Sequence, residues 1–92
     1  MAARIYNGTL VADEIETLTA SPSFVEARIV NVDGVAPIYI RGDGVDPETP
    51  WDDCEIIPAA IGYLVVRLSR KGSPTVLKMV SPGTPTYSVK FS

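Results

Sequence analysis

The sequence predicts a small all-β domain, an antiparallel sandwich of about seven or eight short strands without a significant helix. Three observations carry this prediction. No stretch of about ten residues repeats apolar side chains at the helical spacing of three and four. β-Branched and aromatic residues alternate with polar ones along most of the chain. Glycine and proline interrupt this alternation roughly every 8–12 residues, which is the spacing of strands and turns in sandwiches.

Two extended segments open the chain. Residues 9–12 predict a short strand, which continues past a single aspartate into residues 14–19. In the second segment Ile15 alternates with Glu14 and Glu16, so we expect both carboxylates on one solvated face of a sheet. A Ser-Pro-Ser sequence then ends the strand.

Residues 24–32 and 36–41 predict the next two strands. The expected apolar faces are formed by Val25, Ala27 and Ile29 in the first and by Ile38 and Ile40 in the second. The pair Asp33-Gly34 between them predicts a tight turn, because glycine tolerates the positive φ that such turns require.

The second half of the chain predicts four more strands: residues 54–57, 62–68, Thr75–Val80 and 87–91. Their expected inward-facing residues are Leu64, Val66, Leu68, Leu77, Met79, Tyr87, Val89 and Phe91. Lys71-Gly72-Ser73-Pro74 and Ser81-Pro82-Gly83 predict turns. Strands of this kind bury one face each by packing two sheets together, and a sandwich of immunoglobulin-like or jelly-roll-like kind is the favoured arrangement. Residues 1–92 form a single domain in this prediction.

Composition bounds the partners. The net charge is −3 without a basic cluster, which disfavours nucleic acid and anionic membranes as partners. No apolar run approaches the ~20 residues of a membrane helix, and the start of the chain lacks the layout of a secretory signal, so we expect folding in a cytoplasm. With one cysteine no internal disulfide can form, and a small domain without disulfides often gains stability as a homo-oligomer.

Candidate catalytic groups are few. The chain has no histidine, so it holds no Ser-His, Cys-His or His-metal site of its own. Cys54 lies between Asp53 and Glu55, whose charges disfavour a reactive thiolate. The adjacent Asp52 and Asp53 point in opposite directions in an extended segment, which is unlike a glycosidase pair. We therefore expect neither an enzyme nor a cofactor.

The most unusual stretch is RGDGVDPETPWDD, residues 41–53, which we name the acidic loop. Its five carboxylates offer oxygen ligands for calcium, but their spacing does not match an EF-hand. Asp in turns also caps its own backbone while Gly and Pro shape the chain, so a stiff structural turn is the favoured interpretation and calcium stays an alternative. The loop starts with Arg41-Gly42-Asp43, but proline stiffening argues against receptor binding through that tripeptide.

Trp51 is the loop residue most typical of a contact. A tryptophan in a polar loop either folds back over the edge of the core or meets a partner, and both alternatives stay open. Together with Tyr39 it could also stack on a sugar. The residues predicted to contact a partner are Trp51, Tyr39, Arg41, Asp43 and Asp46.

A resemblance adds to this prediction. Residues 38–47, IYIRGDGVDP, resemble the turn IYFxxDGxxPT of small immunoglobulin-like modules, including the C-terminal β-domain of chitobiase-type enzymes. Glu48 stands where that pattern commonly has Thr. The wider chain resembles small virion proteins of tailed phages that infect actinobacteria. The matching segments, in chain order, are residues 6–10, 30–34, 57–62 and 81–89.

The resemblance implies a structural protein of a bacteriophage virion. The expected role is a capsid decoration or cement protein that bridges major capsid subunits. A small tail or head–tail component is an alternative, and so is a carbohydrate-binding immunoglobulin-like module displayed on the virion. The module would show sugar affinity in the isolated domain, whereas cement would show self-association or affinity for the capsid.

Overall fold

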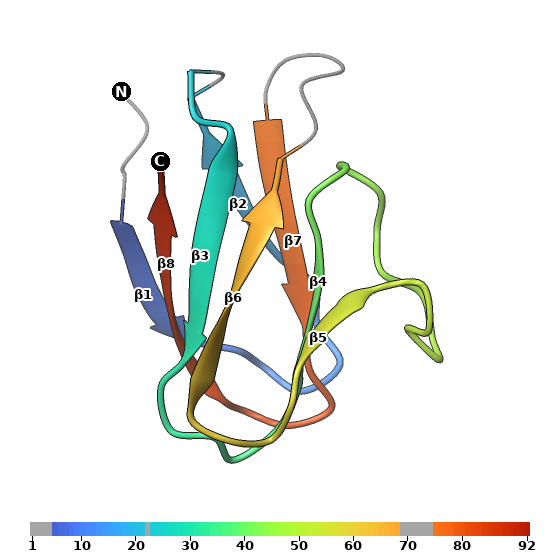
Figure 1. Ribbon diagram of the computed structural model, residues 1–92. Coiled ribbons are helices and arrows are strands. Elements are labelled where there is room, and N and C mark those ends of the chain that lie inside the picture. Colours follow the sequence, from blue (N-terminus) through green and yellow to red (C-terminus); the bar gives the residue numbers. More distant parts are fainter. Residues whose placement is uncertain (1–4, 22, 69–74) are drawn as a thin grey trace.

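The computed structural model describes residues 5–21, 23–68 and 75–92 and confirms the all-β prediction (Figure 1). Its eight strands are β1 (Ile5–Thr9), β2 (Glu16–Ala20), β3 (Glu26–Asn31), β4 (Ile38–Arg41), β5 (Glu55–Ile57), β6 (Gly62–Arg67), β7 (Thr75–Val80) and β8 (Thr86–Phe91). Within these described ranges no helix is present, and so none that could cross a membrane.

The strands form two four-stranded antiparallel sheets with the orders β1-β8-β3-β6 and β2-β7-β4-β5. We name them sheet A and sheet B. Strand β1 pairs with β8, β2 with β7, β3 with β6 and β4 with β5, so the chain is one long hairpin of nested pairs. The β3–β8 and β4–β7 pairings roll this hairpin into two layers. This is the strand order of a jelly roll, and the immunoglobulin-like alternative is wrong in topology.

The core lies between the two sheets and is built from alternate residues of nearly every strand. The predicted inner faces of β4, β7 and β8 are confirmed: Ile38, Ile40, Leu77, Met79, Tyr87, Val89 and Phe91 are buried. The ring of Phe91 meets Phe24 and Tyr6, with ring centroids 6.1 and 5.8 Å apart. In β6 Val66 is buried and Leu64 packs against the core, as the alternation predicts, and Leu68 beyond the strand is buried too.

The predicted strand at residues 9–12 is wrong. Strand β1 ends at Thr9, and Leu10 is buried just beyond it, where its N–H donates to Pro85 O at 3.0 Å. The strand itself has no regular apolar alternation, because Gly8 faces inward opposite Tyr87. The apolar pattern of the sequence therefore indicates the buried Leu10 but does not reveal strand β1, which precedes it.

The expectation of two solvated glutamates on one strand face is also wrong. Strand β2 begins at Glu16, so Glu14 and Ile15 lie in the preceding turn and are exposed. Glu16 shares the inward face of Leu18 and is half-buried. Burial, and then the negative charge of Glu16, raise the pKa of Tyr87.

Val25 does not join the apolar face of Ala27 and Ile29, because it precedes β3 and is exposed. Its N–H donates to Ser92 O, outside the regular ladder. The predicted strand at residues 24–32 is thus shortened to Glu26–Asn31, and that at 54–57 to Glu55–Ile57. The predicted turn at residues 71–74 lies outside the described residues.

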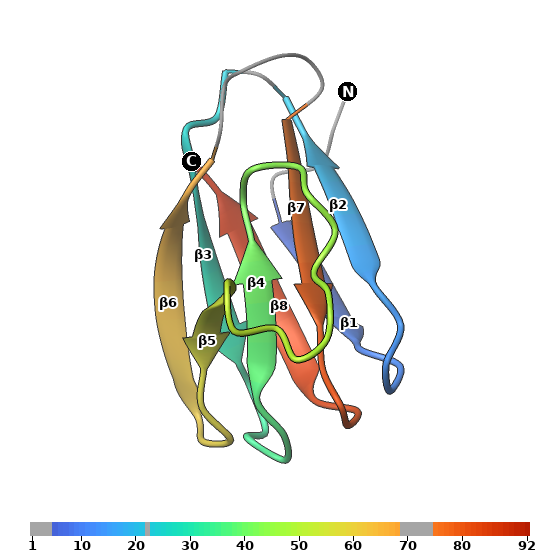
Figure 2. The same cartoon turned by 90° about the vertical axis from the view of Figure 1, so that its right-hand side faces the viewer.

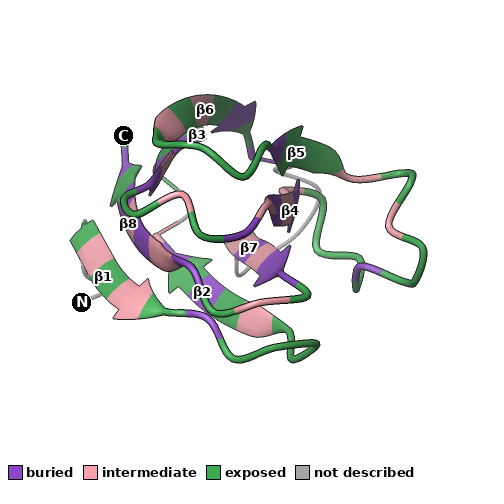
Figure 3. Ribbon diagram, turned by 90° about the horizontal axis from the view of Figure 1, so that it is seen from below, coloured by how far each residue is buried: buried purple, intermediate pink, exposed green. Residues whose placement is uncertain are grey.

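The two layers differ in what covers them. The acidic loop lies over the outer face of sheet B, beside β4 and β7 (Figure 2). Along the described chain, no segment crosses the outer face of sheet A in the same way (Figure 3). The loops β1–β2, β3–β4, β5–β6 and β7–β8 all gather at the lower end of Figure 1. The fold thus presents an open sheet face, a covered sheet face and an end built from four loops.

Candidate partner-binding surfaces

The acidic loop is organised by Arg41, the last residue of β4. Its guanidinium donates to both carboxylate oxygens of Asp43, from Nε at 3.1 Å and from Nη2 at 2.6 Å, and it also pairs with Asp53. Asp43 Oδ1 accepts the N–H of Val45 at 3.1 Å, which closes a tight turn at the start of the loop. The structural-turn interpretation is therefore confirmed for this part of the loop. Arg41 and Asp43 of the Arg-Gly-Asp tripeptide form an ion pair with each other, so both charges are already engaged.

The hydrogen bonds from Arg41 hold the pKa of Asp43 below its usual value, although partial burial opposes them. A folded-state pKa below the unfolded value, which is about 3.9 for aspartate, stabilises the fold above that pH. This stabilisation is lost as the pH falls through the lowered pKa.

We expect Asp43→Asn to flatten the acid side of the stability curve, because the variant has no proton to take up at this site. The measurement is urea unfolding at a series of pH values below neutral. Asp52→Asn is the matched control, since Asp52 is exposed and forms no ion pair within the described chain. Equal acid limbs for wild type and Asp43→Asn would contradict the prediction.

Asp46 is placed apart from Asp43. It pairs with Lys78 of β7, so the middle of the loop is tied to sheet B by a second ion pair. Sequence reasoning missed Lys78 because it lies far along the chain. No group of three or more His, Cys, Asp or Glu side chains that could hold a metal ion occurs among the described residues.

Trp51 folds back onto the sheet and contacts Tyr39, with ring centroids 4.9 Å apart and the rings tilted by 42°. Its φ of +62° is rare for a bulky residue. The turn around it is closed by N–H donation from Trp51 to Glu48 O at 2.6 Å and from Cys54 to Trp51 O at 3.2 Å. Trp51 is thus folded back onto the sheet, and its contact with a partner stays a prediction. The tilted, half-buried pair is not a flat platform for a sugar ring.

An open depression of about 450 Å³ lies beside Arg41, between the ends of β4 and β6. Its polar groups include Arg41, Asp43, Asp53 and Glu55, and the first three already bind one another. Cys54 adjoins this cluster, where burial and then the charge of Asp53 raise the pKa of its thiol. The arrangement stabilises the loop and does not activate a nucleophile.

The structure reveals a second surface that sequence reasoning missed. Exposed apolar side chains lie on the β3–β4 and β5–β6 loops at the loop end of the sandwich, where Ile61 and Val35 are 76% and 64% exposed. We name this surface the apolar end, and it is formed by Val32, Val35, Ala59, Ala60 and Ile61. Next to it on β6, Tyr63 is 68% exposed. A signal was available, because residues 56–66 carry no charged side chain.

Asn31 holds the two loops of the apolar end together from inside the sandwich. It is fully buried at the end of β3, and its Nδ2 donates to Ala36 O at 2.9 Å and to Pro58 O at 3.2 Å. Its Oδ1 accepts the N–H of Gly34 at 3.1 Å. One amide side chain therefore satisfies backbone groups of two loops, which fixes the β3–β4 loop against the β5–β6 loop.

Asp33 ties the same end to β8. Both its carboxylate oxygens accept the N–H of Thr86 at 3.2 Å, and Oδ1 also accepts the N–H of Val35 at 3.4 Å. Burial pushes the pKa of Asp33 upward, but these hydrogen bonds outweigh it and lower the pKa. Asp33 is exposed, but its carboxylate is engaged by these backbone hydrogen bonds, and the other exposed side chains of the β3–β4 loop, Val32 and Val35, are apolar.

Three segments that carry the resemblance meet at this end, namely residues 30–34, 57–62 and 81–89. A Cβ added at Gly34 would lie 2.8 Å from backbone atoms of Ala60 and Ile61, which shows how closely two of these loops pack. No family model matches the chain, and no curated protein or solved structure matches it significantly.

Proposed function

We propose that this protein is a non-enzymatic structural component of a bacteriophage virion, a decoration protein that bridges major capsid subunits. The observation that carries the proposal is the apolar end. Exposed Ile61 and Val35 stand on loops that are already fixed by Asn31 and Asp33. A rigid, mainly apolar surface of this kind loses little conformational entropy on binding, as a docking surface requires.

The fold agrees with the proposal by analogy alone. Jelly rolls occur in viral capsid domains and also in lectins, so the topology supports both a shell protein and a sugar-binding module. The side chains favour the first. A sugar site needs exposed rings beside fixed polar groups, whereas Tyr39 and Trp51 pack on each other and the apolar end offers aliphatic side chains.

We expect the double variant Val35→Ser/Ile61→Ser to bind capsids about tenfold more weakly or worse, because two apolar side chains no longer leave water on docking. Its free energy of unfolding should change by less than about 0.5 kcal/mol, since both side chains are exposed. The measurement is co-sedimentation with empty capsids of the virion to which the proposal assigns this chain.

Val45→Ser/Ile56→Ser is the matched control, because it removes an exposed valine and isoleucine that lie outside the apolar end, in the acidic loop and on β5. Loss of binding in this control, or in Trp51→Ala, with binding retained in the first variant would place the contact at the acidic loop. If the chain does not co-sediment with capsids but binds sugars on a glycan array, the proposal is overturned in favour of the sugar-binding module.

A further inference from the structure

We propose that copies of this chain associate head to tail, with the acidic loop of one copy seated on the outer face of sheet A of the next. The inference is independent of the proposed virion role, since it concerns only the purified chain. It rests on two cations of the open sheet and on two carboxylates of the opposite side, none of which forms an ion pair among the described residues.

The cations are Arg28 of β3 and Lys90 of β8, which stand directly opposite each other in the sheet. Both point outward, because their neighbours Ile29 and Val89 are buried. Like charges in directly opposed positions destabilise a sheet unless an anion lies between them. Among the described residues no carboxylate forms an ion pair with either cation.

Exposed apolar side chains flank this pair. The register places Ile5 beside Lys90 and Val65 beside Arg28, so one row crosses all four strands in the order apolar, cation, cation, apolar. A shallow depression of about 230 Å³ opens next to the pair, lined in part by Glu26 and Ser92. This combination fits a partner surface that carries negative charge and some apolar area.

The acidic loop of a second copy has this chemistry. Asp43 and Asp53 both pair with Arg41, and Asp46 pairs with Lys78. Glu48 and Asp52 are exposed and have no ion-pair partner in the described part of the chain. They project from a loop that is already held against sheet B, so docking them costs little ordering.

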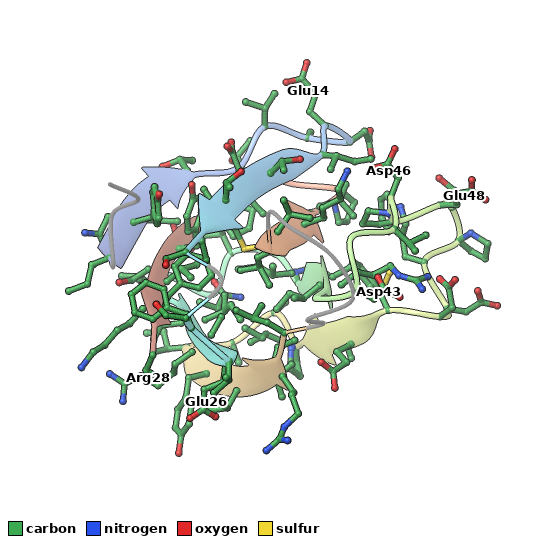
Figure 4. All side chains as sticks on the ribbon, turned by 90° about the horizontal axis from the view of Figure 1, so that it is seen from above. Glu14, Glu26, Arg28, Asp43, Asp46 and Glu48 are labelled. Carbon is green, nitrogen blue, oxygen red and sulfur yellow. The ribbon has the colours of Figure 1, made fainter. Side chains whose placement is uncertain are left out.

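The two surfaces lie on opposite sides of the molecule. Seen along the sandwich from above, Arg28 points to one side and Glu48 to the other (Figure 4). A copy can therefore offer its loop to one neighbour while its sheet receives the loop of another. Such a contact is heterologous, and it produces rings or open rows in place of a closed two-fold dimer.

The test is sedimentation velocity of the purified chain at about 0.01 M and about 1 M salt, where the Debye length changes from about 30 Å to about 3 Å. We expect species larger than a dimer at low salt and monomers at high salt. Arg28→Glu/Lys90→Glu and, separately, Glu48→Lys/Asp52→Lys should each weaken low-salt association by about tenfold or more.

The decisive experiment mixes the two charge-reversed variants. Arg28→Glu/Lys90→Glu keeps an unaltered acidic loop, and Glu48→Lys/Asp52→Lys keeps an unaltered sheet A, so the loop of the first can bind the sheet of the second. We expect the mixture to regain association that neither variant shows alone. Glu14→Lys is the control for net charge, since Glu14 is exposed and belongs to neither the acidic loop nor sheet A. A wild-type monomer at low salt, persistent association of either variant, or no recovery in the mixture would overturn the inference.

Discussion

Replacing Asn31 by alanine is expected to lower the free energy of unfolding by about 3 kcal/mol, since the buried amide serves three backbone groups. In the variant the carbonyl oxygens of Ala36 and Pro58 and the N–H of Gly34 lose their partner. The bond to Ala36 O is buried and the other two are partly buried, and a buried group that loses its partner keeps the cost of having left water. A loss of this size is a large part of the roughly 5–14 kcal/mol that stabilise a domain of this length.

Urea and thermal unfolding measure the effect, and the melting temperature should fall by more than about 10 °C. Asn7→Ala is the matched control, because Asn7 is an exposed asparagine on a strand and should change stability by less than about 0.5 kcal/mol. Asn31→Asp adds a second readout. The carboxylate can accept from Gly34 but repels the two carbonyl oxygens, so its cost should fall when acid protonates it. Equal stability of Asn31→Ala and Asn7→Ala would refute the role of Asn31.

The strand faces were predictable where apolar residues alternate several times in succession. Ile38 with Ile40 and Leu77 with Met79 fix the inward phase of their strands without ambiguity. The phase failed in β2, where Glu16 lies on the same face as Leu18 and a single isoleucine outside the strand suggested the opposite face. Strand order was beyond sequence reasoning, because immunoglobulin-like and jelly-roll sandwiches share the same local alternation and differ only in long-range pairing.

The acidic loop was predictable in outline, since its prolines, glycines and aspartates act on their own backbone. The Tyr39–Trp51 contact and the Arg41–Asp53 ion pair could not be predicted, because each joins residues twelve positions apart whose proximity depends on the folded loop. The apolar end could not be assembled from sequence, because it joins loops that follow β3 and β5. Each loop alone contains two or three exposed apolar residues, which is unremarkable on a protein surface.

A second large effect is expected at Gly34, where alanine should cost about 2–4 kcal/mol of unfolding free energy. Gly34 has a φ of +67°, and its missing Cβ would lie 2.8 Å from the backbone of Ala60 and Ile61. Backbone cannot rotate aside as a flexible side chain can, so the β3–β4 and β5–β6 loops must separate. That separation also moves Val35 away from Ile61, so the proposed function predicts weaker capsid binding even in the fraction that remains folded.

Gly44→Ala separates the two causes. Gly44 has a similar positive φ of +81°, but its added Cβ would meet only Val76 Cγ2, at an ordinary 3.5 Å. It should cost about 1 kcal/mol, the penalty of the left-handed backbone alone. The excess of Gly34→Ala over Gly44→Ala therefore measures how tightly the two loops pack. Equal costs would mean that the loops are free to part, and a preformed apolar end would then be the wrong basis for docking.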